Sequence, residues 1–141
     1  MKVRNRELSG LLQGLKALDG LTDGSGRITT YFKHTSSFRM DLARNIRKVQ
    51  AALDDYSQVR QRMVLSSHLT FEPNQVQGYV KPTMDESVKA QMEIMAFDAE
   101  EVKFEVPLKQ IKHADLNLDK NDVPPSVLGL LMPIIEDEPQ K

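Results

Sequence analysis

The sequence predicts a mainly α protein with a minor β element (α+β), in which a long central helix is packed by shorter N- and C-terminal helices. Three observations predict this class. Residues 37–68 contain no Gly or Pro, and their apolar side chains recur at steps of three and four. A Leu-rich periodic segment precedes them, and a short apolar segment introduced by two prolines lies near the end of the chain.

The long helix at 37–68 is the element around which the rest is organised. A stripe this long on one helix cannot stay in water in a stable fold, so we expect it to pack against the helix at 5–18 and against the C-terminal helix. Thr35, Ser36 and Ser37 are candidate N-caps. The apolar stripe consists of Leu42, Ile46, Val49, Leu53, Tyr56 and Met63.

The N-terminal segment predicts a short amphipathic helix over 5–18, with Asn5 as its N-cap. Gly10 and Gly14 lie four residues apart and lower helix propensity, which suggests either close approach of another backbone or a weak helix held by packing. Gly20 is expected to end the helix.

The segments on either side of the long helix contain turn signals. Residues 21–27 include Asp-Gly-Ser-Gly and predict a loop. Residues 28–33 are β-branched and aromatic, which predicts a short strand or an extended lead-in. After the long helix, residues 69–83 predict an extended loop.

The acidic second half predicts a helix, a strand and a final helix. Thr83 and Glu86 match a capping box, so a helix is expected over 84–97. Residues 102–106 alternate apolar with charged side chains, which predicts a half-buried strand. Prolines 124 and 125 then introduce the last short helix, which Pro133 ends. The apolar stripe of the helix at 84–97 consists of Met84, Val88, Met92 and Met95.

Size and composition predict a single domain over 1–141, with a basic helical part (1–68), the loop (69–83), an acidic helix-strand-helix part (84–135) and an acidic tail (136–141). There is no Cys, which excludes disulfides and thiolate chemistry. No apolar run is long enough for a membrane span, and we identify no signal peptide. The seven Met suit an irregular core or an adaptable contact surface.

Charge is distributed unevenly along the chain. Residues 1–62 have a net charge of +6 and residues 63–141 a net charge of −7. This asymmetry is compatible with a nucleic-acid surface, with attraction between the two halves of one subunit or of neighbouring subunits, or with two solvated faces. We expect the two halves to be complementary, within one subunit or between neighbours.

Two groups of residues are candidate partner-binding sites. The basic residues of the long helix could follow phosphates, but Asp41, Asp54 and Asp55 interrupt them and no aromatic stacking pattern accompanies them, so we favour a solvated or ion-paired face. The apolar residues of the last helix could anchor a partner or pack in the subunit's own core. The candidates are Arg39, Arg44, Arg47, Lys48, Arg60, Arg62, Leu128, Leu130 and Leu131.

The sequence carries no catalytic or cofactor motif that we can identify. The three His are not spaced as zinc ligands. The alternating oxygens from Asp115 to Asn121 open like a calcium loop, but Lys120 replaces the required Gly and Ser126 the bidentate Glu. We therefore expect no enzyme activity, no metal and no cofactor.

Three segments of this chain resemble a family of small proteins encoded by tailed bacteriophages and prophages, often near structural and morphogenesis genes. They are Asn5-Arg6-Glu7-Leu8, the run from Leu42 to Val49 in a helix that continues through Tyr56 and Arg60, and the ending from Val123 to Glu136. The chain departs from the family in the Gly-rich loop at 23–26 and in the segment at 69–83. The resemblance implies a phage setting and no active site.

The leading hypothesis is therefore a non-enzymatic bacteriophage protein, a virion structural or assembly component that works through contacts with other phage structural proteins or with itself. The alternative is an intracellular accessory factor that binds a host protein or nucleic acid. We expect the protein in the virion or in the host cytoplasm, and expect no contact with a membrane.

Overall fold

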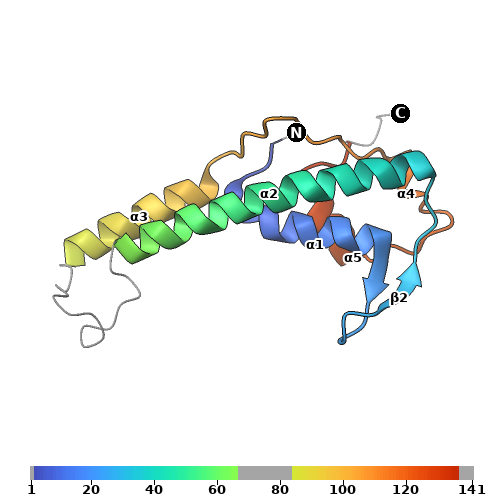
Figure 1. Ribbon diagram of the computed structural model, residues 1–141, viewed down its shortest axis with the longest axis horizontal. Helices are drawn as coiled ribbons and strands as arrows, with labels where there is room; N and C mark the ends of the chain where they lie inside the picture. The colour runs from blue at the N-terminus through green and yellow to red at the C-terminus, as the bar shows by residue number, and fades with distance from the viewer. Residues whose placement is uncertain (1, 67–83, 137–141) are drawn as a thin grey trace.

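The computed structural model describes residues 2–66 and 84–136 and is mostly helical, with one small antiparallel sheet (Figure 1). The predicted fold class is therefore confirmed. The elements are η1 (Asn5–Glu7), α1 (Leu8–Asp19), β1 (Gly20–Thr22), β2 (Ile28–Tyr31), α2 (Ser36–Ser66), α3 (Met84–Ala99), α4 (His113–Leu116) and α5 (Pro125–Leu131). The loop predicted at 69–83, the cap predicted at Thr83 and the tail beyond Glu136 lie outside the described residues.

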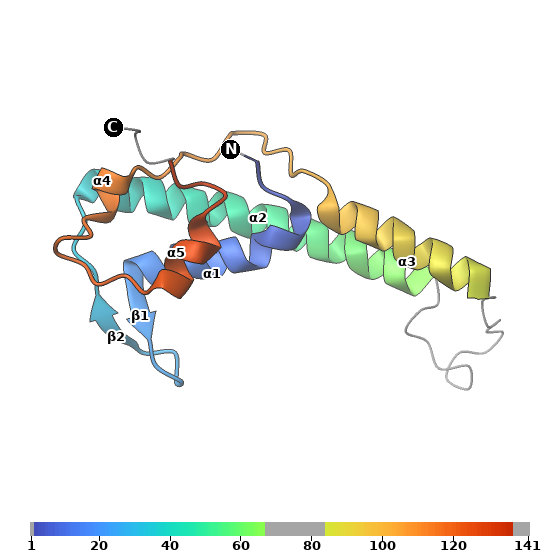
Figure 2. The same cartoon turned by 180° about the vertical axis from the view of Figure 1, so that it is seen from behind.

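Helix α2 runs through the whole molecule and confirms the predicted long helix (Figure 1). Thr35 caps it as predicted, because its Oγ1 accepts a hydrogen bond from the Phe38 amide at 3.2 Å. The N-terminal half of α2 packs against α1, and its C-terminal half packs against α3 (Figures 1 and 2). We call α3 together with residues 56–66 of α2 the arm, since this helix pair extends away from α1 and α5.

Helix α1 lies at the centre of the core, with four leucines completely buried. Leu42 and Val49 of α2 pack into the same cluster, which confirms the predicted contact between the long helix and the N-terminal helix. The predicted contact between the long helix and the C-terminal helix is not the main one, because α5 packs mainly against α1 (Figure 2). The far end of the α2 stripe, including Tyr56, instead lies beside α3. The four leucines are Leu8, Leu11, Leu15 and Leu18.

The two glycines of α1 allow α5 to approach closely, as their spacing suggested. A Cβ added at Gly10 would lie 3.0 Å from Leu130 Cδ2. A Cβ at Gly14 would lie 3.0 Å from both Leu131 Cγ and Cδ2. The loss of helix propensity at these positions is therefore offset by the packing of α5.

The segment after α1 contains the turn predicted from Asp-Gly-Ser-Gly, but the first residues of the predicted loop at 21–27 pair in a hairpin. Gly20 to Thr22 pair antiparallel with β2, which confirms the strand expected at 28–33 but adds β1 to it. Helix α1 ends at Asp19 with Gly20 as its C-cap, which confirms the predicted stop. The Gly20 backbone is extended and not left-handed, and a Cβ there would lie 2.6 Å from Ile28 Cγ2 and 2.7 Å from the Thr30 carbonyl oxygen. Crowding by the facing strand β2 therefore explains why position 20 is a glycine. The side chain of Asp23 closes the turn by accepting hydrogen bonds from the Ser25 hydroxyl and amide.

Residues 100–112 form an extended segment, which we call the strap, that runs back along α2 (Figure 2). The half-buried strand predicted at 102–106 is wrong. The strap makes only isolated bridges, such as Arg4 with Glu101, and Val106 is 60% exposed. Alternating side chains cannot build a strand without a neighbouring strand to share a ladder of hydrogen bonds.

Three buried asparagines connect the strap and the loops to the helices. Asn45 of α2 donates to the Lys109 carbonyl at 2.8 Å and accepts from the Lys109 amide at 3.0 Å. Asn121 likewise accepts a hydrogen bond from the Lys33 amide and donates one to the Lys33 carbonyl. Asn5 donates to the Phe97 carbonyl at 2.8 Å, so it is not the N-cap predicted from the sequence. Each amide side chain offers a donor and an acceptor, which lets it replace a missing backbone partner.

Candidate functional site

The arm is held together by the row of α3 side chains that faces α2. Ile94 lies in the middle of this row and is only 6% exposed. Phe97 lies at one end, where its ring packs on the ring of Tyr56 with centroids 5.3 Å apart. Apolar burial along this row therefore positions α3 against the second half of α2.

A polar cluster joins α3 to α2 at the base of the arm. Asp98 of α3 accepts a hydrogen bond from the Tyr56 hydroxyl at 2.5 Å and from Arg60 Nε at 3.0 Å. Burial raises the pKa of Asp98, but the hydrogen bonds from Arg60 and Tyr56 outweigh it and hold this pKa below its ordinary value. Burial and the hydrogen bond to Asp98 raise the pKa of Tyr56 to about 12. The donor role of Tyr56 follows from its contact with Asp98, which links α3 to α2.

The opposite side of α3 presents apolar side chains to solvent. Val88, Met92 and Met95 are 48%, 65% and 69% exposed. Their spacing of four and three places them in one stripe along the helix, which we call the α3 face. The stripe predicted for this helix is therefore present, but it points away from α2. The side chain of Met84, its first predicted member, lies outside the described residues.

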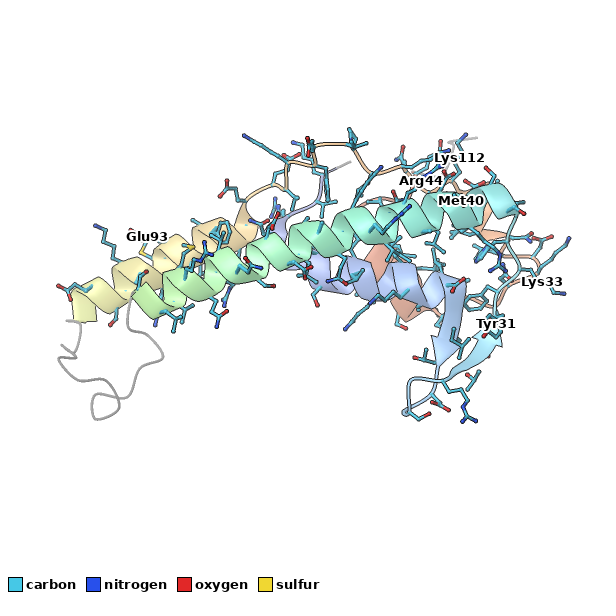
Figure 3. The ribbon with its side chains drawn as sticks, in the orientation of Figure 1. Tyr31, Lys33, Met40, Arg44, Glu93 and Lys112 are labelled. Carbon is cyan, nitrogen blue, oxygen red and sulfur yellow. The ribbon has the colours of Figure 1, made fainter. Side chains whose placement is uncertain are left out.

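Helix α3 has two apolar rows, which explains why the predicted stripe points away from α2. The row around Ile94 and Phe97 packs on α2, so the α3 face is left exposed. On the helix surface, the exposed and uncharged Gln91 lies between Val88 and Met95, and the exposed Ala96 follows Met92 by one turn. Lys89 precedes Met92 by one turn, so it borders the face, and with Glu93 it lines a shallow cleft between α3 and α2. Figure 3 labels Glu93 on this part of the arm.

The structure does not gather the predicted basic residues of α2 into one surface. Arg39 donates to the Phe32 carbonyl at 3.0 Å, and Lys48 donates to the Pro107 carbonyl at 3.1 Å. Arg60 is bound to Asp98 at the base of the arm. At roughly 100° per residue, these side chains leave the helix in different directions. Arg44 and Arg47 are exposed and lie one turn apart on α2, and Arg44 also lies 3.9 Å from Asp41. Arg62 is exposed much further along the helix.

The end of the molecule where α2 begins contains two exposed apolar residues for which the sequence contained no signal. Tyr31 is 67% exposed and Met40 is 51% exposed, and Figure 3 shows them at the same end as Lys33, Arg44 and Lys112. Tyr31 comes from β2 and Met40 from α2, so no spacing within one element could have indicated them.

The candidate leucines of the last helix are used inside the subunit. Leu131 is completely buried, and Leu128 packs against the core. Leu130 is half-buried and lies against Gly10. The three leucines therefore fasten α5 to α1.

The described part of the chain contains no group of three or more His, Asp or Glu placed to hold a metal ion. The oxygen-rich segment at 115–121 is instead used structurally, because the Asn121 amide binds the backbone of Lys33 and the Leu116 carbonyl. No helix of the described residues is long and apolar enough to cross a membrane.

Fold and site together define a mostly helical α+β protein whose two-helix arm exposes an apolar face. Comparisons with family models, with curated proteins and with solved structures found no match to this chain.

Proposed function

We propose that this is a non-enzymatic bacteriophage protein that works through protein–protein contacts, as a virion structural or assembly component. The observation that supports this most strongly is the α3 face. Met92 and Met95 each expose about two thirds of their surface on a helix whose other side is already packed. Leaving such side chains in water forgoes roughly 25 cal/mol for each Å² of apolar area that a contact would cover. Contiguous apolar surface of this kind is typical of interaction sites.

The chemistry of the face suits a protein partner. Methionine is unbranched and polarisable, so it adapts to an opposing surface better than a branched side chain does. The cluster of Tyr56, Arg60 and Asp98 holds α3 in place, which limits the ordering that binding would require. A rigid helix with an exposed stripe can pack against another helix or lie in an apolar groove.

The phage setting rests on the sequence resemblance, and the non-enzymatic role rests on the lack of a catalytic motif in the sequence. The partners we propose are other phage structural proteins or a second copy of this chain. The protein would act in the virion or in the host cytoplasm during assembly.

Mass spectrometry of purified particles and of assembly intermediates tests this proposal. We expect the wild-type chain at stoichiometric copy number in one of the two fractions, and we expect a folded Met92→Glu variant to be depleted there. Val106→Glu is the matched control, because Val106 is 60% exposed on the strap and away from the α3 face. Absence of the wild type from both fractions would contradict the proposal and favour an accessory role in the host cell. Equal incorporation of Met92→Glu would show that α3 is not the contact surface.

A further inference from the structure

An open cavity of about 310 Å³ lies at the base of the arm, where four segments of the chain meet. Its walls come from η1, from the middle of α2, from the end of α3 and from the first residues of the strap. Figures 1 and 2 both show the end of α3 and the N-terminal segment meeting beside the middle of α2. The residues of the α3 face do not line this cavity, so it is a second and separate surface.

Part of the cavity wall is apolar and aromatic. Ala52, Tyr56 and Val59 follow one another at helical spacing along α2, and Phe97 lines the cavity from α3. The rings of Tyr56 and Phe97 pack on each other with centroids 5.3 Å apart. Aromatic rings attract a cation that lies over their faces, so this pair favours a positively charged ligand.

The charged part of the wall is mostly acidic. Asp55, Glu100 and Glu101 line the cavity, and none of the three forms an ion pair within the described part of the chain. Lys103 is the only cation among the described lining residues, which leaves the wall a net charge of −2 at neutral pH. Helix α3 ends beside the cavity at Ala99, and the last carbonyl groups of a helix carry partial negative charge. The cavity therefore attracts a cation.

Asn5 adds a hydrogen-bond acceptor to this wall. The residue is 9% exposed, and its Nδ2 donates to the Phe97 carbonyl at 2.8 Å. Its Oδ1 receives no hydrogen bond from the described residues, and yet it is not sealed from solvent. Because Asn5 lines the cavity, this oxygen is open to a donor that enters there.

Two arginines near the base of the arm do not occupy the cavity. Arg60 is bound to Asp98 at 3.0 Å, and Arg6 acts on the same carboxylate through its charge. Neither arginine lines the cavity, so the three carboxylates of its wall have no cation bound to them.

A second open cavity continues the first one along the strap. Its volume is about 460 Å³, and it shares Ala52, Asp55 and Lys103 with the first. It extends between α2 and the strap as far as Lys48 and Val106. Two adjacent cavities of this kind form a groove that fits a side chain together with the backbone that carries it.

We propose that this groove binds an arginine side chain of a partner protein, with the guanidinium group in the first cavity and the partner's backbone along the strap. Guanidinium offers five N–H donors for separate acceptors and a flat face that stacks on aromatic rings. Lysine offers a point charge without a flat face. The inference goes beyond the proposed function, because it defines a second contact by its own chemistry and does not depend on the α3 face.

A short peptide, acetyl-Gly-Arg-Gly-amide, is the probe for this site. It is titrated into the isotope-labelled full chain and followed by NMR of the backbone amides. We expect it to shift the amide signals of Asn5, Tyr56 and Glu101, and to bind more tightly than the same peptide with Lys. The matched peptide with citrulline, a neutral isostere of arginine, should bind about tenfold more weakly, because charge-assisted hydrogen bonds are about twice as strong as neutral ones.

Charge variants test whether the cation occupies this cavity. Asp55→Asn and Glu101→Gln should each raise the dissociation constant of the Arg peptide by about threefold, which corresponds to the loss of one exposed ion pair. Lys103→Gln should lower it, because this change removes the competing cation. Asp54→Asn is the matched control, since Asp54 is exposed, bonds to Gln50 and does not line the cavity. All four positions are exposed, and circular dichroism checks that each variant keeps its helices.

Each result supports or overturns a defined part of the inference. Equal binding of the citrulline peptide would overturn the cation site, and equal or tighter binding of the Lys peptide would overturn the choice of arginine. Unchanged binding in Asp55→Asn and Glu101→Gln, or an equal loss in Asp54→Asn, would overturn the location. No binding up to the solubility limit of the Arg peptide would overturn the inference as a whole. Particle incorporation of Met92→Glu tests the proposed function separately from all of these results.

Discussion

Replacement of Asn45 by Ala tests how the strap is held to α2. Asn45 is 2% exposed, and its side-chain amide makes both of its hydrogen bonds to the backbone of Lys109, at 2.8 and 3.0 Å. The strap has no neighbouring strand over most of its length, so this side chain replaces the partner that a sheet would supply. Ala at position 45 removes the donor and the acceptor together and leaves the Lys109 amide and carbonyl without protein partners.

The expected loss of stability follows from these two bonds. A buried backbone group left without a partner costs about 1–3 kcal/mol. The side chain of Lys109 is exposed, so water can reach part of its backbone, and the lower half of that range applies to each group. We therefore expect the free energy of unfolding to fall by about 3 kcal/mol. For a chain of this size, this corresponds to a lowering of the melting temperature by about 10 °C.

Thermal and urea unfolding, followed by circular dichroism, measure this loss. Gln50→Ala is the matched control, because Gln50 lies on the same helix but bonds only to Asp54, one turn away and exposed. The control should change stability by no more than about 0.5 kcal/mol. A loss below about 1 kcal/mol in Asn45→Ala would refute the reasoning, since it would show that water satisfies the strap as well as Asn45 does.

The packing of α5 and the polar cluster of the arm lead to three further predictions. Gly14→Ala should destabilise the protein, because the new Cβ meets the buried Leu131 at 3.0 Å. Gly10→Ala should be neutral or stabilising, because its Cβ meets only the end of the half-buried Leu130 side chain. Urea unfolding of both variants measures the difference. The folded-state pKa of Asp98 is lowered, so this carboxylate stabilises the fold above its ordinary pKa of 3.8. That stabilisation is lost as the pH falls through the lower folded-state pKa. The melting temperatures of wild type and Asp98→Asn should therefore converge below about pH 4. Ultraviolet titration should show Tyr56 ionising at about pH 12. Asp98→Asn should lower the pKa of Tyr56, because the carboxylate that accepts the hydrogen bond of the Tyr56 hydroxyl and repels the phenolate is gone. An unchanged titration would contradict the assigned contact.

The sequence alone was sufficient for most of the helices, for physical reasons that act within a few residues. Apolar spacing predicted α2 and α3 close to their observed bounds, and the proline pair predicted the start of α5. The spacing of Gly10 and Gly14 suggested the close approach that α5 makes. These signals depend on the repeat of the helix and on the local backbone, both of which the chain carries in its order of residues.

Long-range competition decided the features that the sequence analysis missed. An Asn near the start of a helix fits an N-cap, but Asn5 instead reaches the Phe97 carbonyl, 92 residues further along the chain. An alternating segment fits a strand, but the strap has no strand beside it and depends on Asn45. A buried amide side chain can replace either partner, and only the folded chain determines which backbone comes within its reach.

The exposed arm shows the same division between local and tertiary control. The period of α3 placed Val88, Met92 and Met95 on one stripe, and this followed from the sequence. The period could not decide whether that stripe or the row containing Ile94 and Phe97 would be buried, because both rows are apolar and both have helical spacing. Tertiary packing decided it: Phe97 reaches Tyr56, and Asp98, the next residue, reaches both Tyr56 and Arg60. The helix can satisfy these contacts in only one rotation about its axis, and that rotation turns the methionines to the solvent.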